Sequence, residues 1–384
     1  MSVIKTGTTS TTGYIVESDT NGNLVIQTGS TPTTALTLNS NQTATFAQSV
    51  NIPNTFGFKN RIINGDMRID QRNAGASVTQ TTNLLYTVDR FAVVGSVTSK
   101  FTAQQSTTAA TGFSNSLLCT SSSAYTVGAS EDFSVRHYIE GFNSADLGWG
   151  TANASAVTLS FWVRSSLTGT FGGSIANSAQ DRFYVFSYTI NAANTWEQKT
   201  ITISGDTAGT WVTNNGIGIR IFWSLGAGAT VSSTAGSWGT TFYRSATGAV
   251  SVVGTNGATF YITGVQLEKG STATSFDYRP YGTELMLCQR YFQVFDSIYI
   301  EGYANVGLVR AINAPMTFPV QMRATPTRTV KTAGTLSNVR SNSTAYAGLG
   351  INGLTATYAS ASIESAASGL VQCLNQSETM SAEL

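Results

Sequence analysis

Aromatic residues and arginines recur along several short apolar segments, and this combination of residue types is suited to binding sugars. Successive side chains of an extended segment point to opposite faces. In "VTLSFWVRSS" (157–166), "RFYVFSYTI" (182–190) and "IGIRIFWSLG" (217–226), one alternating set fits a core. Aromatic rings stack on the apolar faces of sugars, and arginine donates forked hydrogen bonds to hydroxyls or carboxylates. The other set supplies the candidate glycan-binding residues Trp162, Arg164, Tyr184, Tyr188, Arg220 and Phe222. Alternatively, a neighbouring subunit covers this face, or it forms a second core layer.

Two segments are rich in charge, although the whole chain is only 11% charged. They are "KNRIINGDMRIDQR" (59–72) and "GVQLEKGSTATSFDYRPYGTELMLCQRYF" (264–292). If the two segments lie side by side as the entering and leaving strands of one domain, their opposite charges can pair. We therefore expect a structural charge clamp made by Asp66, Arg68, Asp70, Glu268, Asp277 and Arg279. A structural calcium site at Asp66 or Glu268 is the alternative, because carboxylates and backbone carbonyls suit that ion.

The residues that catalysis requires are sparse in this chain. Hydrolysis of a polysaccharide normally uses two carboxylates flanking the bond, and the adjacent Glu131 and Asp132 would point to opposite faces of a strand. There is one histidine, His137, three scattered cysteines and no nucleophile-elbow motif. We therefore expect a protein that is not an enzyme and needs no cofactor, with a polysaccharide depolymerase as an alternative.

Composition narrows the expected partners. The 21 Lys and Arg residues nearly balance the 20 Asp and Glu residues, and positive charge is not clustered. Nucleic-acid binding needs such a cluster, so no nucleic acid is expected as a direct ligand. The N-terminal residues lack a signal-peptide pattern, and no stretch approaches the length of a membrane span, so no membrane insertion is expected. The cysteines fit buried free thiols made in a reducing cytoplasm.

Residues 1–55 are predicted to form short strands separated by polar turns. Short groups of apolar residues, or apolar pulses, recur along this region at 14–16, 24–26, 35–38, 44–46 and 50–52. Pulses of two or three bulky residues are too small to build a monomeric core. We therefore predict an intertwined fibre stem, formed by three copies of the chain, with a disordered linker as the alternative.

Residues 56–282 show two-residue alternation in segment after segment, with no helical pattern between them. Many strands of this kind predict a jelly-roll β-sandwich. Residues 283–384 return to short apolar pulses and are predicted to form a small C-terminal β domain. Between the two regions, "TELMLCQRYFQVF" (283–295) is the convincing helical candidate, with Leu285 and Cys288 on its apolar side and Glu284 facing water. A short linker helix and a continuing strand are both compatible with this segment.

The last strand of the middle region, "TFYITGVQLEKG", contains a break in its alternation. Phe260 and Ile262 share one face, whereas Val265 and Leu267 have the opposite parity. A β-bulge adds one residue to a strand and is favoured at glycine. A bulge at Gly264 would therefore bring all four apolar side chains to the core.

Five segments, in this order, resemble fibre and appendage proteins of tailed bacteriophages, notably cyanophage-like ones: "NRIINGDMRIDQRNAG", "YTVDRF", "VTLSFWVRSS", "GVQLEKGSTATSFDYRPYGTELMLCQRYF" and "FPVQMRATPT". The resemblance covers residues 56–330, and the block at 264–292 is its most specific part. It implies a middle region similar to carbohydrate-binding jelly rolls. It also implies a homotrimeric virion component that is assembled in the host cytoplasm and contacts the host surface.

The combined expectation is an all-β virion fibre protein with a trimeric stem (1–55), a carbohydrate-binding-like jelly roll (56–282) and a C-terminal β tip (283–384). Its N-terminus would attach to a phage tail adaptor or another virion protein, and it would bind host-surface polysaccharide noncovalently as a tail fibre. Well-known podovirus tail fibres begin with a longer tail-docking domain than the 55 residues found here. The distal half of a two-part fibre and a capsid fibre or decoration protein with a structural role are therefore the alternatives.

Overall fold

The computed structural model describes residues 22–28, 33–38, 40, 44–46, 58–304, 312–332, 335–338, 346–352, 355–356, 358–365 and 369–384. Its contacts divide the chain into two compact units, Met1–Phe56 and Gly57–Leu384. No helix among the described residues is long and apolar enough to cross a membrane. The predicted boundary between 282 and 283 lies inside the second unit, and the division into three domains stays a prediction.

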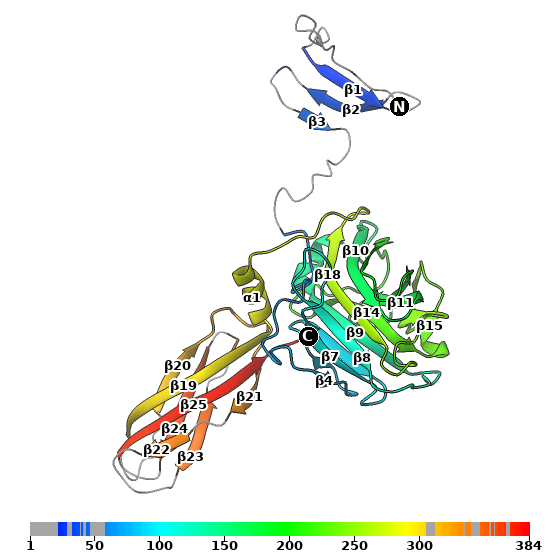
Figure 1. The fold of residues 1–384 in the computed structure, drawn as a ribbon. Coiled ribbons are helices and arrows are strands. Elements are labelled where there is room, and N and C mark those ends of the chain that lie inside the picture. Colours follow the sequence, from blue (N-terminus) through cyan, green and yellow to red (C-terminus); the bar gives the residue numbers. More distant parts are fainter. Residues whose placement is uncertain are drawn as a thin grey trace, which may run out of the picture. The chain divides into compact units, whose positions relative to one another are not determined.

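The described part of the N-terminal unit is a three-stranded antiparallel sheet (Figure 1). It contains β1 (Leu24–Thr28), β2 (Thr33–Leu38) and β3 (Ala44–Phe46), which coincide with three of the predicted pulses. Val25 and Ile26 of β1 are exposed. The pulses at 14–16 and 50–52 lie outside the described residues, and the association of three copies stays a prediction.

Two antiparallel sheets of the second unit pack into the predicted jelly-roll β-sandwich (Figure 1). The six-stranded sheet runs in the order β13 (Glu197–Ile203), β10 (Val157–Ser165), β18 (Thr259–Lys269), β8 (Ser116–Ser121), β7 (Phe101–Ser106) and β4 (Val78–Thr79). The seven-stranded sheet runs in the order β16 (Trp238–Gly239), β12 (Phe183–Ile190), β11 (Gly169–Ala176), β14 (Ile217–Ala227), β9 (Asp132–Glu140), β6 (Phe91–Gly95) and β5 (Leu85–Tyr86).

Short elements lie in the connections of the sandwich. They are the 3₁₀ turns η1 (Gly141–Asn143), η2 (Ala145–Leu147) and η3 (Ala229–Val231), and the two-residue strands β15 (Ser232–Ser233) and β17 (Ser245–Ala246). β15 and β17 pair in parallel. β17 packs on β11 at Gly172, where a Cβ atom would lie 2.5 Å from the backbone nitrogen of Ala246. Glycine therefore allows the β17 segment to lie directly on the seven-stranded sheet.

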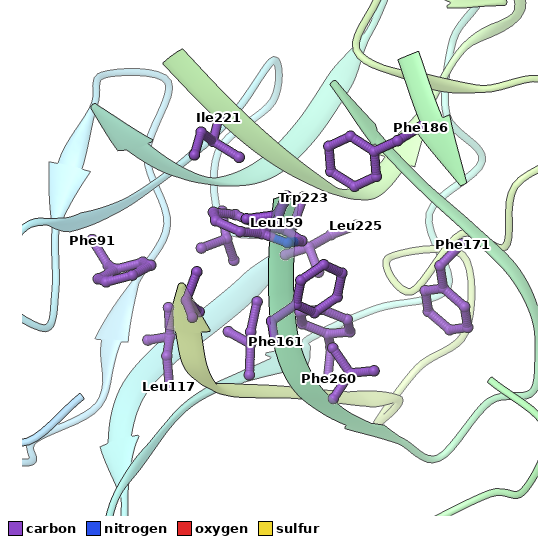
Figure 2. Packing of buried hydrophobic residues seen from close by; sticks show 14 of the residues in the cluster. Phe91, Leu117, Leu159, Phe161, Phe171, Phe186, Ile221, Trp223, Leu225 and Phe260 are labelled. Carbon is purple, nitrogen blue, oxygen red and sulfur yellow. The ribbon is translucent and has the colours of Figure 1, made fainter. Parts of the chain in front are cut away.

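The core of the sandwich lies between the two sheets and is built from alternate residues of their strands (Figure 2). In β14, Ile221, Trp223 and Leu225 are completely buried, as their shared parity predicts. Trp223 meets the ring of Phe161 from the opposite sheet edge-on, with the ring centroids 6.0 Å apart. Full burial of each large apolar side chain contributes about 1.5–3 kcal/mol, so this interior dominates the stability of the sandwich.

The predicted bulge in β18 is confirmed. The pairing register between β10 and β18 shifts at this point: Ser160 lies opposite Gln266, and Trp162 lies opposite Thr263. Gly264 has φ +58°, a left-handed conformation that glycine adopts without a Cβ clash. The four apolar side chains on either side of it are completely buried: Phe260, Ile262, Val265 and Leu267.

The predicted helix is α1 (Tyr281–Gln289), and it is shorter than expected because β19 (Phe292–Ala304) begins soon after it. The expectation that Glu284 faces water is wrong, since this residue is only 4% exposed. Its carboxylate accepts hydrogen bonds from Nη1 of Arg279 at 3.1 Å and from the backbone N–H of Asn64 at 2.5 Å. Burial is tolerated because a guanidinium and an amide replace the water.

The C-terminal part adds two small antiparallel sheets (Figure 1). The first has the order β19, β25 (Gly369–Ser381) and β21 (Thr327–Thr332), with β22 (Thr335–Asn338) also pairing with β25. The second has the order β20 (Ile312–Thr317), β24 (Tyr358–Ser365) and β23 (Tyr346–Asn352).

A buried charged network joins these C-terminal elements to the sandwich. Arg90 is 1% exposed, pairs with Glu383, and has its guanidinium carbon 3.6 Å from the ring centroid of Tyr291. The Tyr291 hydroxyl donates a 2.6 Å hydrogen bond to Glu140, which also pairs with Arg290 at 2.6 Å. Several of the few charged residues of this chain therefore connect elements that are distant in the sequence.

Candidate ligand-binding site

An open pocket lies on the outer face of the seven-stranded sheet, on the side away from the core. Its volume is about 380 Å³. The lining side chains include Ser96, Asp132, Arg136, Gln180, Phe242 and Arg244. The combination of arginines, an aromatic ring and amide and hydroxyl groups is one that can bind a sugar.

Strands β6 and β9 supply lining residues of this pocket, and β14 pairs with β9 beside it. Phe222 lies opposite Arg136 in the sheet, and Arg220 lies opposite Tyr138. Because Ile221 and Trp223 face the core, their neighbours Arg220 and Phe222 must point to the outer face. Phe222 is fully buried there in a second, smaller apolar cluster, beneath the guanidinium of Arg244.

Arg244 is the central side chain of the pocket. It is only 3% exposed, and its guanidinium carbon lies 3.6 Å from the ring centroid of Phe242 and 4.2 Å from that of Phe222. Nη2 donates a 2.7 Å hydrogen bond to Oε1 of Gln180. Nε lies 3.8 Å from a carboxylate oxygen of Asp132. Among the described residues, no acceptor forms a hydrogen bond with Nε or Nη1.

Positive charge gathers around Arg244. Arg136 donates to Asp132 at 2.8 Å and to the Ser134 hydroxyl at 2.9 Å. The guanidinium carbon of Arg220 lies 4.8 Å from the ring centroid of Tyr138. Burial, together with the charge of Arg136, lowers the pKa of Arg244 to about 9. The guanidinium therefore remains protonated at neutral pH.

The loop that holds Arg244 in place has an unusual backbone. Gln180 adopts φ +58°, a left-handed conformation that non-glycine residues seldom occupy. Its amide N–H donates a 3.3 Å hydrogen bond to the carbonyl of Asn177, and its side chain reaches Arg244. Such conformations cost about 1–3 kcal/mol and persist where the surroundings fix them, so this loop is held in a defined position beside the pocket.

The six predicted glycan-binding residues divide among three places. Arg220 and Phe222 lie at the outer face described above, as predicted, although Phe222 is covered and cannot be reached from solvent. The placement of Tyr184 and Tyr188 on a non-core face is wrong, because both side chains belong to the main core cluster. Side chains do alternate along β12 as expected, but the tyrosines and Phe186 face the core, and Phe183 lies on the outer face.

Trp162 and Arg164 lie on the outer face of the other, six-stranded sheet. Both side chains are half-buried. The guanidinium carbon of Arg164 lies 4.9 Å from the ring centroid of Tyr261, and Nε donates a 2.8 Å hydrogen bond to the carbonyl of Asn194. Trp196 meets Tyr261 edge-on at 6.0 Å. This second aromatic face is separate from the pocket at Arg244.

The two charged segments do lie side by side. The backbone N–H of Arg61 donates to the carbonyl of Leu267 at 3.0 Å, and that of Val265 donates to Gly65 at 2.9 Å. The predicted ion pairs between the segments are wrong for the described residues, because most of the carboxylates are taken up by nearby groups. Hydrogen bonds to the backbone connect the segments instead: Arg68 donates to the carbonyl of Arg279 at 2.9 Å, and Arg279 donates to the carbonyl of Ile62 at 3.1 Å.

Each carboxylate of the predicted clamp has a different partner. Asp66 pairs with Arg68, in its own segment. Asp70 accepts backbone N–H groups of its own turn, and Glu268 accepts the Thr274 hydroxyl at 2.7 Å. Asp277 accepts the backbone N–H of Lys59 at 2.8 Å. Within the described part of the chain, no group of three or more His, Cys, Asp or Glu side chains could hold a metal ion, so Asp66 and Glu268 are not part of such a cluster.

His137 and two of the three cysteines occupy interior positions. His137 is 1% exposed, and its ring packs 4.7 Å from that of Phe91. Burial and the charge of Arg90 hold the pKa of His137 well below its usual range. Cys119 and Cys288 are buried free thiols, as predicted, whereas the side chain of Cys373 lies outside the described residues.

Arg136, Gln180, Phe242 and Arg244 were not identified from the sequence. The position of Arg136 is predictable from the sequence, because alternation puts Phe133 and Val135 of β9 on the buried core face and Arg136 on the outer face. The segment around Arg244 offers no such signal, because it crosses the sheet as a short irregular connection.

Comparisons with known proteins gave structural likenesses only. No family model matches the sequence, and a search of curated proteins gave no match. One similar solved structure is a family 4 carbohydrate-binding module, with 14% identity, covering 54% of this chain and 99% of that one, at a TM-score of 0.27. A family 11 carbohydrate-binding module from Clostridium thermocellum, in complex with a β-1,3-1,4-mixed-linked tetrasaccharide, has 10% identity, coverage of 54% and 100%, and a TM-score of 0.27.

A third similar structure is the enzymatically active domain of tailspike protein 4 from bacteriophage CBA120. It has 12% identity, covers 55% of this chain and 21% of that one, and has a TM-score of 0.28. At these TM-scores the likenesses carry no argument about the ligand or the biological role of this chain. The all-β sandwich is established by its own strand order and core.

Proposed function

We propose that this chain is a fibre protein of a tailed-bacteriophage virion that binds host-surface glycan noncovalently at the pocket around Arg244. One observation carries the proposal: a nearly buried guanidinium with two nitrogens that lack acceptors among the described residues lies in an open pocket beside an exposed aromatic ring. Phe242 is 40% exposed. A sugar can place its apolar face on this ring while its oxygens accept hydrogen bonds from the arginines.

The sequence resemblance to phage fibre proteins supports the virion role. Noncovalent binding, rather than hydrolysis, is favoured by the partners of Asp132, which is the carboxylate among the described lining residues. Its carboxylate already accepts a hydrogen bond from Arg136 at 2.8 Å, so it is engaged within the protein rather than directed at a ligand. The proposal places the protein in the virion, with its N-terminal unit attached to a tail adaptor or another virion protein.

The exposed apolar residues of the N-terminal sheet support the proposed homotrimer. Val25 is 41% exposed and Ile26 is 46% exposed. In a trimeric stem these side chains would pack against copies of themselves. Light scattering on the purified protein should give three times the mass of the chain, and Ile26→Glu should reduce it. A monomeric wild-type protein would contradict the trimer.

A glycan array with the purified full chain tests the binding function. The wild-type protein should bind a defined subset of glycans without releasing sugar. Arg244→Met should lose that binding. Trp162→Ala, on the opposite sheet, is the matched control and should retain it. Loss of binding only in the Trp162 variant would move the site to the six-stranded sheet, and release of reducing sugar would replace noncovalent binding by hydrolysis.

A further inference from the structure

The pocket has more positive than negative charge. Two arginines line it, Arg136 and Arg244, and Asp132 is the carboxylate among the described lining residues. Asp132 is shared between the two arginines, at 2.8 Å from Nη2 of Arg136 and 3.8 Å from Nε of Arg244. A single carboxylate cannot neutralise this set of cations.

Arg244 differs from another deeply buried arginine of the same unit. Arg279, which is 5% exposed, has Glu284 at 3.1 Å and the carbonyl oxygen of Ile62 at 3.1 Å. Arg244 is 3% exposed, yet its closest carboxylate oxygen is at 3.8 Å and already bonded to Arg136. Arginines are almost never fully buried unless they are paired. The charge of Arg244 therefore lacks a full counter-charge from the described residues.

The remaining lining groups suit the binding of a sugar better than the binding of a free ion. Arg136 uses Nε for Ser134 and Nη2 for Asp132, and we assign its third nitrogen, Nη1, to the ligand. The exposed ring of Phe242 provides an apolar platform next to the Arg244 guanidinium. A sugar lying on this ring would bring an acidic substituent close to both guanidinium groups.

We propose that the pocket selects acidic glycans, with the carboxylate or sulfate of one sugar unit bound between Arg136 and Arg244. This inference rests on the glycan-binding function proposed above and adds the chemical class of the ligand. Charge-assisted hydrogen bonds to an anion are roughly twice as strong as those to a neutral hydroxyl, so the acidic group dominates the selection.

Calorimetric titration with two matched pairs of saccharides tests the selection. The first pair is trigalacturonic acid and its fully methyl-esterified form, which share a backbone and differ in charge. The second pair is dextran sulfate and dextran, which tests sulfate. The wild-type protein should bind at least one acidic member more tightly than its neutral partner, by about tenfold or more. Raising NaCl from about 50 mM to about 500 mM should reduce that preference, because salt screens exposed charges.

Three variants separate this charge effect from a loss of folding. Arg244→Met should abolish the preference for the acidic member, whereas Arg164→Met, which removes an arginine from the other sheet, should retain it. Asp132→Asn removes the competing carboxylate and should increase the preference. A gain of binding cannot result from misfolding, so this variant tests the inference even if the arginine variants are unstable.

The outcomes distinguish this inference from the function on which it rests. Equal affinity for both members of both pairs, or a preference that survives Arg244→Met, would overturn the acidic selection while leaving glycan binding in place. Failure to bind any saccharide on the array or in the titrations would count against glycan binding itself. An unchanged preference in Asp132→Asn would contradict the proposed competition between Asp132 and the ligand.

Discussion

The guanidinium carbon of Arg244 lies 3.6 Å from the ring centroid of Phe242, on the outer face of a sheet whose other face forms the core of the sandwich. A cation close to an aromatic ring is attracted to its face. This contact orients the arginine without using an anion. The charge of Arg244 is thus held in place by Phe242 and Gln180 while its neutralisation is incomplete.

The first prediction concerns the effect of the buried Arg244 charge on the stability of the protein. Arg244→Met keeps the apolar contacts with Phe242 and removes a buried, incompletely paired charge. Replacing a buried charge by an apolar residue of similar size is often neutral or stabilising. The melting temperature should therefore stay within about 2 °C of wild type or increase. A decrease of more than about 5 °C would show that Arg244 is a structural residue.

The second prediction concerns the buried pair of Arg279 and Glu284. Glu284→Ala leaves the Arg279 guanidinium buried without its carboxylate, which should destabilise the protein by about 3–5 kcal/mol. Asp146→Ala is the control, because Asp146 is 57% exposed in its pair with Arg61. Loss of an exposed pair should cost at most about 1 kcal/mol. Urea unfolding monitored by tryptophan fluorescence measures both, and equal effects would contradict the structural role of Glu284.

The third prediction concerns the bulge in β18. At Gly264 an added Cβ would lie 2.6 Å from the ring of Phe113 and 3.0 Å from that of Trp162, and φ is +58°. At Gly257 φ is +73°, but no atom lies within 4 Å of an added Cβ. Both alanine variants incur backbone strain, whereas only Gly264→Ala adds a steric clash. Overpacking typically costs about 1–3 kcal/mol, so Gly264→Ala should be the less stable by that amount. The same melting temperature for both variants would argue against the bulge.

The fourth prediction concerns the pH dependence of stability. Burial raises the pKa of Asp89 to about 6, although Arg72 opposes the shift. The folded state therefore retains a proton that the unfolded state releases near pH 4. Stability from this group is greatest below that pH and is lost as the pH rises toward 6. Over this window the loss is about 3 kcal/mol at most.

Asp89→Asn tests the pH effect, because asparagine does not titrate. The stability difference between the variant and the wild type should shift in favour of the variant as the pH rises from about 4 to about 6. Thermal unfolding at several pH values measures this difference. A difference that is constant with pH would contradict the raised pKa.

Alternation alone predicted much of the sandwich. It grouped Ile219, Ile221, Trp223 and Leu225 on one face, which is the core face, and Arg220 on the other. Ile217, which alternation assigns to the same face, packs against the outer cluster instead, because the register shifts between Ile217 and Ile219. Alternation also located the bulge at Gly264, where the parity of the apolar residues changes. Apolar pulses likewise identified β1, β2 and β3.

The remaining features depend on contacts between distant parts of the chain. Alternation divides β12 into two sets but does not say which set faces the core, so Tyr184 and Tyr188 were misplaced. The predicted ion pairs of the charge clamp are wrong because backbone amides compete for the carboxylates, as they do at Asp277. Arg244 reaches the sheet from an irregular connection, and only tertiary structure shows that it packs on Phe222.

The location of the binding site is the central claim, and hydrogen–deuterium exchange with a saccharide identified on the array tests it most directly. Saturating ligand should slow amide exchange in residues 132–136, 178–182 and 242–246, which surround the pocket. Residues 159–164 of the opposite sheet should exchange at unchanged rates. Protection restricted to residues 159–164 and 194–198, with none around Arg244, would contradict the account.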